Sequence, residues 1–103
     1  MSDHELFESE VVLVRRILEG ETELYYQLIR PYRRMIYASA FSILRSEIDA
    51  EDVVQQTLLN GLASLRSFRG QSRISTWLTQ MVINEARMRL RKDACAAPFR
   101  LRK

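Results

Sequence analysis

Polar side chains suited to binding nucleic acid recur between residues 73 and 91 of this chain. Guanidinium groups bind phosphates, and the amides of asparagine and glutamine both donate to and accept from base edges. The residues of this set are Arg73, Gln80, Asn84, Arg87 and Arg91. Apolar residues beside them repeat at helical spacing and predict a buried stripe formed by Ile74, Trp77, Leu78, Met81 and Val82. The pattern predicts a helix with one buried side and one side able to contact nucleic acid.

A short polar loop, residues 68–73, precedes this helix. Gly70 allows a backbone bend that other residues resist, and Ser72 is predicted to be the N-cap of the helix. Phe68 begins the loop, where it either closes the core or forms one wall of a pocket for a base. We expect Trp77 to lie mainly in the core, with one edge near the loop. The candidate nucleic-acid residues in and beside the loop are Phe68, Arg69, Gln71, Ser72 and Trp77.

Catalytic and metal-binding chemistry find little support in the sequence. His4 is the single histidine, and the single cysteine, Cys95, has no neighbouring Cys or His with which to bind a metal. The three glycines are scattered, so they form no phosphate-binding loop. Glu51 and Asp52 fall in the first turn of a predicted helix, where the helix dipole favours acids. We therefore expect neither an enzyme nor a protein with a metal or cofactor.

Composition and charge favour one small domain. The chain has 103 residues, of which 47% are hydrophobic, and this is enough for one small core. Its net charge is +3, but residues 1–30 carry seven acids and three bases, whereas residues 87–103 carry seven bases and one acid. A basic end indicates either a polyanionic partner or a solvated tail.

The cellular compartment is predicted from the same composition. A lone cysteine suits a reducing cytoplasm. No apolar run approaches the roughly 20 residues that span a bilayer, and the acidic N-terminus lacks the apolar stretch of a secretory signal. We expect a cytoplasmic protein without a membrane span.

Helical periodicity predicts two helices in the first half of the chain. Residues 8–19 form the first, which ends where Gly20 tolerates left-handed dihedrals, and the residues before it are expected to fray. The second is a long helix over residues 22–44, with Thr22 as its N-cap. Pro31 lies inside that helix and is predicted to kink it rather than end it, because the apolar spacing resumes beyond it.

Two more helices are predicted in the second half. The third begins at Asp49 as N-cap and carries buried positions as far as Leu65. Gly61 inside it costs about 1 kcal/mol relative to alanine, which close approach of another helix would explain. The fourth follows the loop and ends near Lys92. We predict an all-α, compact bundle of about four helices, with residues 94–103 as a linker or basic tail.

Two motifs of this chain together resemble the second conserved region of bacterial sigma factors. The motifs are DAEDVVQQ at residues 49–56 and FRGQSRISTWL at residues 68–78. Their order and separation are similar to those of the extracytoplasmic-function (ECF) group of the sigma-70 family, and the resemblance covers about residues 10–92. Two positions differ from the family pattern, since Gln56 stands where Glu is usual and Leu58 where an aromatic residue is usual.

The resemblance implies a subunit that binds core RNA polymerase and recognises and melts the promoter −10 element in transcription initiation. The third helix would bind the paired clamp helices of the largest polymerase subunit. The loop and fourth helix would read the non-template strand as single-stranded DNA, with Arg87, Arg89, Arg91 and Lys92 on phosphates. One base would be flipped into a pocket where the loop meets the fourth helix, bracketed by Phe68, Gln71, Ser72 and Asn84. The polymerase contacts implied are Asp49, Asp52, Gln55, Gln56 and Leu59.

Further expectations follow from the same resemblance. Residues 1–93 would be the sigma region 2 domain, and the region 4 domain that reads the −35 element would be absent from this chain. An anti-sigma factor would be a further partner. The alternative is a helical protein-interaction module with a basic tail and no promoter role, although such a module has no need of the amide-rich loop and helix face.

Overall fold

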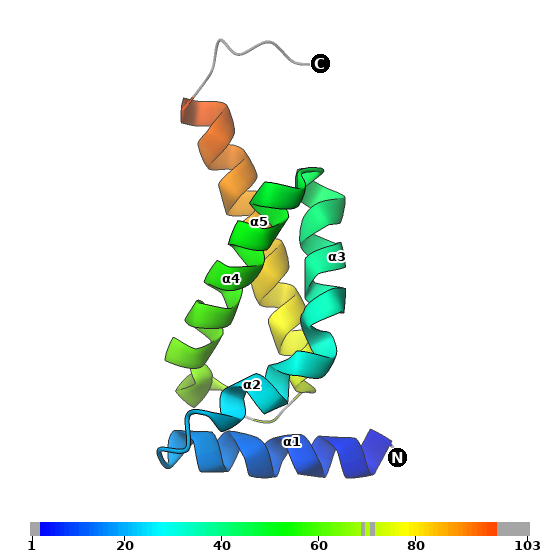
Figure 1. Cartoon of the computed structure of the whole chain (residues 1–103), viewed down its shortest axis with the longest axis vertical. Coiled ribbons are helices and arrows are strands. Elements are labelled where there is room, and N and C mark those ends of the chain that lie inside the picture. Colours follow the sequence, from blue (N-terminus) through cyan, green and yellow to red (C-terminus); the bar gives the residue numbers. More distant parts are fainter. Residues whose placement is uncertain (1–2, 69, 71, 97–103) are drawn as a thin grey trace.

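The computed structural model describes residues 3–68, 70 and 72–96, and every regular element found there is helical (Figure 1). The predicted all-α class is therefore confirmed. The elements in chain order are α1 (Asp3–Leu18), α2 (Leu24–Ile29), the 3-10 helix η1 (Arg30–Tyr32), α3 (Arg33–Leu44), α4 (Glu47–Ala63), the 3-10 helix η2 (Leu65–Ser67) and α5 (Ile74–Ala96).

Three helices form the body of the bundle. α3, α4 and α5 each pack against the other two and run along the long axis of the molecule (Figure 1). α1 lies across one end of them with α2 beside it, and the C-terminal turns of α5 extend past the other end (Figure 1). No helix in the described ranges is long and apolar enough to cross a membrane.

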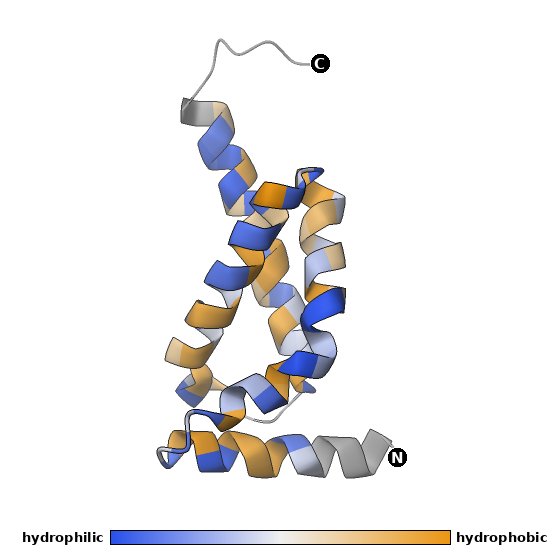
Figure 2. Cartoon of the chain, in the orientation of Figure 1, coloured by the Kyte–Doolittle hydropathy of each residue, from blue (hydrophilic) through white to orange (hydrophobic). Residues whose placement is uncertain are grey.

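The buried stripes that hold this bundle together match the predicted ones. Val53, Val54 and Leu58 of α4 are buried, and so are Ile74, Leu78 and Val82 of α5. Polar and apolar residues alternate along both helices in Figure 2, as expected where one side of a helix faces a core. Removal of these apolar side chains from water drives the packing.

The first half of the chain departs from prediction at three places. The first helix begins at Asp3, before the predicted start at residue 8. Thr22 is not the cap of the next helix, because Glu23 precedes α2 and makes no side-chain cap hydrogen bond.

The α-helix ends at Ile29, and Pro31 lies in η1 before α3 begins, so the proline interrupts the helix instead of only kinking it. Proline has no N–H to donate and its ring crowds the preceding turn. Gly20 does adopt the predicted positive φ, at 120°.

The start of α4 also differs from prediction. Ser46 is the N-cap, and its Oγ accepts a hydrogen bond from the Asp49 backbone N–H at 3.2 Å. Ser46 has the extended dihedrals that an N-cap residue needs. Asp49, predicted as the cap, lies in the first turn, and its carboxylate extends towards another helix.

Gly61 of α4 allows a close approach, as predicted. A Cβ at this position would lie 2.6 Å from the hydroxyl oxygen of Tyr25. That hydroxyl donates to the Leu58 carbonyl at 2.6 Å, and burial raises the pKa of Tyr25 to about 12. Glycine at position 61 therefore lets the Tyr25 side chain of α2 pack directly against the backbone of α4, where the sequence predicted the approach of a whole helix.

The C-terminal helix is longer than predicted. α5 continues to Ala96 and not only to Lys92, so residues 94–96 are helical where a linker was expected. Alanine is the best helix former, and it occupies positions 94 and 96. The rest of the predicted tail, residues 97–103, lies outside the described residues.

Candidate nucleic-acid interface

One side of α5 carries the predicted nucleic-acid stripe. Its positions follow one another by four, three, four, three and four residues, which keeps them on one face of a helix. They are Arg73, Trp77, Gln80, Asn84, Arg87 and Arg91. The last four are exposed, and no side chain of these four forms a hydrogen bond or ion pair with another described residue. Two amides and two guanidinium groups are therefore available to a ligand along about three turns of helix.

Arg73 differs from the rest of the stripe. Its Nη2 donates to the Tyr32 hydroxyl at 3.0 Å and lies 3.5 Å from Oε2 of Glu10. These contacts hold the guanidinium against η1 and α1. Contact between Arg73 and DNA stays a prediction, but this arginine already has partners within the protein.

Phe68 and Trp77 form the aromatic part of the site. Both are half-buried, and their rings lie 5.3 Å apart at 52°. Phe68 and Gly70 also border a pocket of about 320 Å³, whose other wall is α1. The residues lining this pocket from α1 are Val11, Val14, Arg15 and Leu18, and Glu19 just after α1 lines it as well.

The structure separates residues that the sequence placed in one pocket. Asn84 does not line the pocket beside Phe68, and it lies ten residues beyond the start of α5, about 15 Å along the helix axis. Ser72 does not cap α5 either, since its hydroxyl donates to the Arg73 carbonyl at 3.4 Å. Arg69 and Gln71 of the predicted site lie outside the described residues.

The second predicted face, on α4, borders a groove. This groove of about 720 Å³ runs between α4 and the C-terminal half of α5. Asp52, Gln55, Gln56 and Leu59 are among the residues that line it from α4, and the lining residues from α5 are Glu85, Met88, Arg89, Arg91 and Lys92. Arg91 therefore lies at the border between this groove and the stripe. The Leu59 side chain is 65% exposed, and Met88 is 52% exposed. The groove thus combines apolar surface with amides and charges, as a surface that binds another protein often does.

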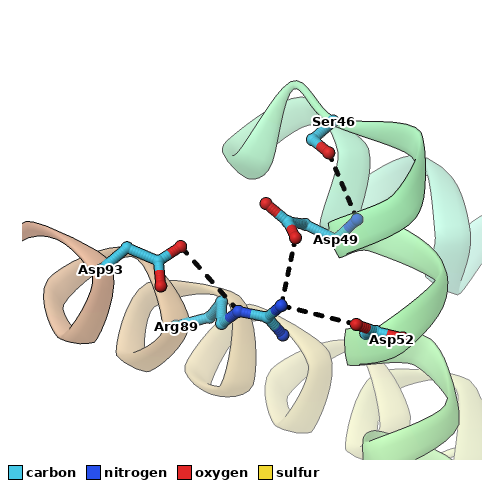
Figure 3. Close-up of polar contacts among 5 residues, drawn as sticks. All are labelled: Ser46, Asp49, Asp52, Arg89 and Asp93. Atoms are coloured by element: carbon cyan, nitrogen blue, oxygen red, sulfur yellow. Dashed lines mark hydrogen bonds and ion pairs between the residues drawn. The ribbon is translucent and has the colours of Figure 1, made fainter. Parts of the chain in front are cut away.

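Arg89 connects the two helices beside this groove (Figure 3). Its Nη2 lies 3.1 Å from Oδ1 of Asp49 and 3.4 Å from Oδ2 of Asp52, both on α4. Its Nε lies 3.9 Å from Asp93, one turn further along α5. Arg89 was expected to bind phosphates with its neighbours, but its guanidinium points towards these carboxylates. Two residues of the predicted polymerase face, Asp49 and Asp52, are correspondingly engaged within the chain.

Several residues beside these faces were missed by sequence reasoning. Met88 and the residues of α1 around the loop belong to this group, and so does Glu10. The burial of Glu10 could have been predicted, because Glu10, Val14 and Ile17 share one helical face. An acid among buried apolar positions needs a polar partner. No cluster of three or more His, Cys, Asp or Glu residues suited to a metal occurs in the described part of the chain.

Comparison with known proteins gives one family and a set of relatives. The model of sigma-70 region 2 matches residues 28–94, which leaves α1 before the matched region. The chain is 32% identical over 75 residues to the ECF RNA polymerase sigma-E factor of Haemophilus influenzae, covering 73% of this chain and 39% of that protein. It is 34% identical over 76 residues to the protein of the same name from Escherichia coli, covering 74% of this chain and 39% of the relative. The aligned part spans about two fifths of these relatives.

Proposed function

Because this chain belongs to the sigma-70 region 2 family and is similar to its ECF members, we propose that it binds core RNA polymerase and recognises and melts the promoter −10 element. The observation that carries this proposal is the pair of faces on α4 and α5. One is a groove with exposed apolar residues, and the other is a stripe of unengaged amides and guanidinium groups. Two partners of different chemistry fit these two faces better than one partner does.

Each face has its own part in the proposed mechanism. The α4 groove binds the clamp helices of the polymerase through Leu59 and the amides around it. On α5, Arg87 and Arg91 hold phosphates of the non-template strand, while Gln80 and Asn84 contact base edges. Binding the strand only in its unpaired form shifts the equilibrium towards the melted promoter. The protein acts in the cytoplasm with polymerase, and an anti-sigma factor is a further partner that we infer from the family.

Copurification with core polymerase tests this function directly. The chain is expected to co-elute with core enzyme, and the complex is expected to bind a single-stranded −10-like oligonucleotide more tightly than a scrambled one at fixed salt. A helical interaction module without a promoter role would bind neither partner specifically, and that result would replace the proposal.

Salt dependence separates the phosphate-binding arginines from the one engaged within the chain. The slope of log K against log salt is negative, and Arg87→Ala and Arg91→Ala are each expected to reduce its magnitude by about 0.7, as loss of one phosphate contact on a single strand does. Matched and scrambled strands should weaken about equally. Arg89→Ala is the matched control, since Asp49 and Asp52 already neutralise that guanidinium, and its slope should stay near wild type. An equal drop for Arg89→Ala would mean that these ion pairs open when DNA binds.

A further inference from the structure

Among the residues whose side chains the structure describes (9–68, 70 and 72–94), Glu10 of α1 is the only charged one that is buried, at 4% exposure. A carboxylate in that position is costly unless polar groups surround it. The Tyr32 hydroxyl donates to its Oε2, and Arg73 Nη2 lies 3.5 Å from the same oxygen. Its Oε1 accepts from the backbone N–H of Ile74 at 3.4 Å. One side chain thus joins α1, η1 and the first residue of α5.

The N-terminus of α5 has neither an acidic residue nor a side-chain cap of its own. The helix has no acidic residue in its first turn, although the N-terminal end of a helix dipole favours negative charge. Ser72, just before the helix, does not supply a cap. Glu10 reaches this end from α1, 64 residues earlier in the chain, and occupies the place that a local capping residue would take.

α1 also packs against η2, which ends just before the loop. Val11 and Val14 line the pocket that Phe68 and Gly70 border. α1 therefore packs against η2 before the loop and reaches the start of α5 after the loop through Glu10. α1 lies before the region that the family model matches, so this arrangement is not part of the family assignment.

We propose that Glu10 is a positioning residue, through which α1 holds Arg73 and the start of α5 in the arrangement that selects a base. Glu10 itself contacts no DNA in this arrangement. It acts through Arg73 and Ile74, so that the start of α5 is fixed before the strand arrives and binding does not have to supply that order. This inference rests on the proposed function, because it concerns the selectivity of the same site.

The test replaces Glu10 with glutamine in the complex with core polymerase. Glu10→Gln keeps the volume of the side chain and removes its charge. Binding is measured to single-stranded oligonucleotides varied one position at a time. Discrimination at the position read by the loop is expected to fall about tenfold, while polymerase affinity and the salt slope stay unchanged. Glu23→Gln is the matched control, since Glu23 is exposed and makes no cap hydrogen bond.

Two further measurements keep the proposal falsifiable. Tyr32→Phe removes only the hydroxyl between Glu10 and Arg73 and should lower the same discrimination, which covers the case in which Glu10→Gln does not fold. In the free chain, amide hydrogen exchange at Ile74 should become about tenfold faster in either variant, with amides in the middle of α4 unchanged.

The outcomes distinguish this inference from the function on which it rests. If the wild-type complex discriminates between bases and the folded variants discriminate equally well, Glu10 is only structural and the inference is wrong. Lower stability with intact discrimination leads to the same conclusion. If the wild-type complex discriminates at no position, the proposed function fails, and unchanged exchange at Ile74 would then overturn the positioning role independently.

Discussion

Replacing Asn84 with alanine is expected to cost about 1–3 kcal/mol in binding a strand that carries the preferred base at one position, and much less for the other bases. The Asn84 side chain is exposed on α5 and engaged with no other described residue. An amide that both donates and accepts can pair with a base edge, and removing it leaves that edge without its partner. Selectivity should relax at that position only.

The measurement is binding by the polymerase complex to oligonucleotides varied one position at a time. Gln27→Ala is the control, because Gln27 is an exposed amide on α2, away from the stripe. Asn84 lies about 15 Å along α5 from its start, so we expect Phe68→Ala to affect a different position and the two losses to add. A uniform loss at every position would show that Asn84 supports only backbone binding, and base readout by this residue would have to be abandoned.

Replacing Leu59 with aspartate is expected to weaken polymerase binding by about 3 kcal/mol or more. Leu59 is 65% exposed at the middle of the α4 groove and therefore contributes little to the core of the free domain. Binding would bury this side chain, and a charge placed there would lose its water without gaining a partner. Asp52→Ala combined with Gln55→Ala should act in the same direction, with a smaller effect.

The control is Leu90→Asp, the same substitution at a leucine that is 48% exposed on α5 and does not line the groove. Affinity is measured by titrating labelled chain with core polymerase, and circular dichroism with urea unfolding establishes that both variants fold. Wild-type affinity in a folded Leu59→Asp variant would mean that polymerase binds a different face.

The amino-acid sequence by itself determined which sides of α4 and α5 are buried. Apolar residues at a spacing of three and four mark the core sides of α4 and α5, because a helix turns once every 3.6 residues, and no partner is needed to see this. The same reasoning identified the exposed stripe from Gln80 to Arg91. Gly20 and Gly61 were also interpreted correctly, since a positive φ and a close approach both require a residue without a Cβ.

Only the tertiary structure decided how the polar residues are used. Thr22, Asp49 and Ser72 each have the chemistry of a cap, but capping depends on the backbone dihedrals at one residue, and these are set by how neighbouring helices pack. The sequence analysis placed Phe68 and Asn84 on either side of the junction between the loop and the helix, whereas Asn84 lies about 15 Å along α5 from its start.

The partners of the charged residues were the feature that the sequence predicted least. Arg89 meets Asp49 across 40 residues of sequence, and Glu10 meets Ile74 across 64. Such pairs produce no periodicity along the chain, because they arise where α5 crosses α4 and where α1 lies across the end of the bundle. The sequence therefore determined which side chains could bind a phosphate or a base, and the packing of the helices determined which of them are still available to do so.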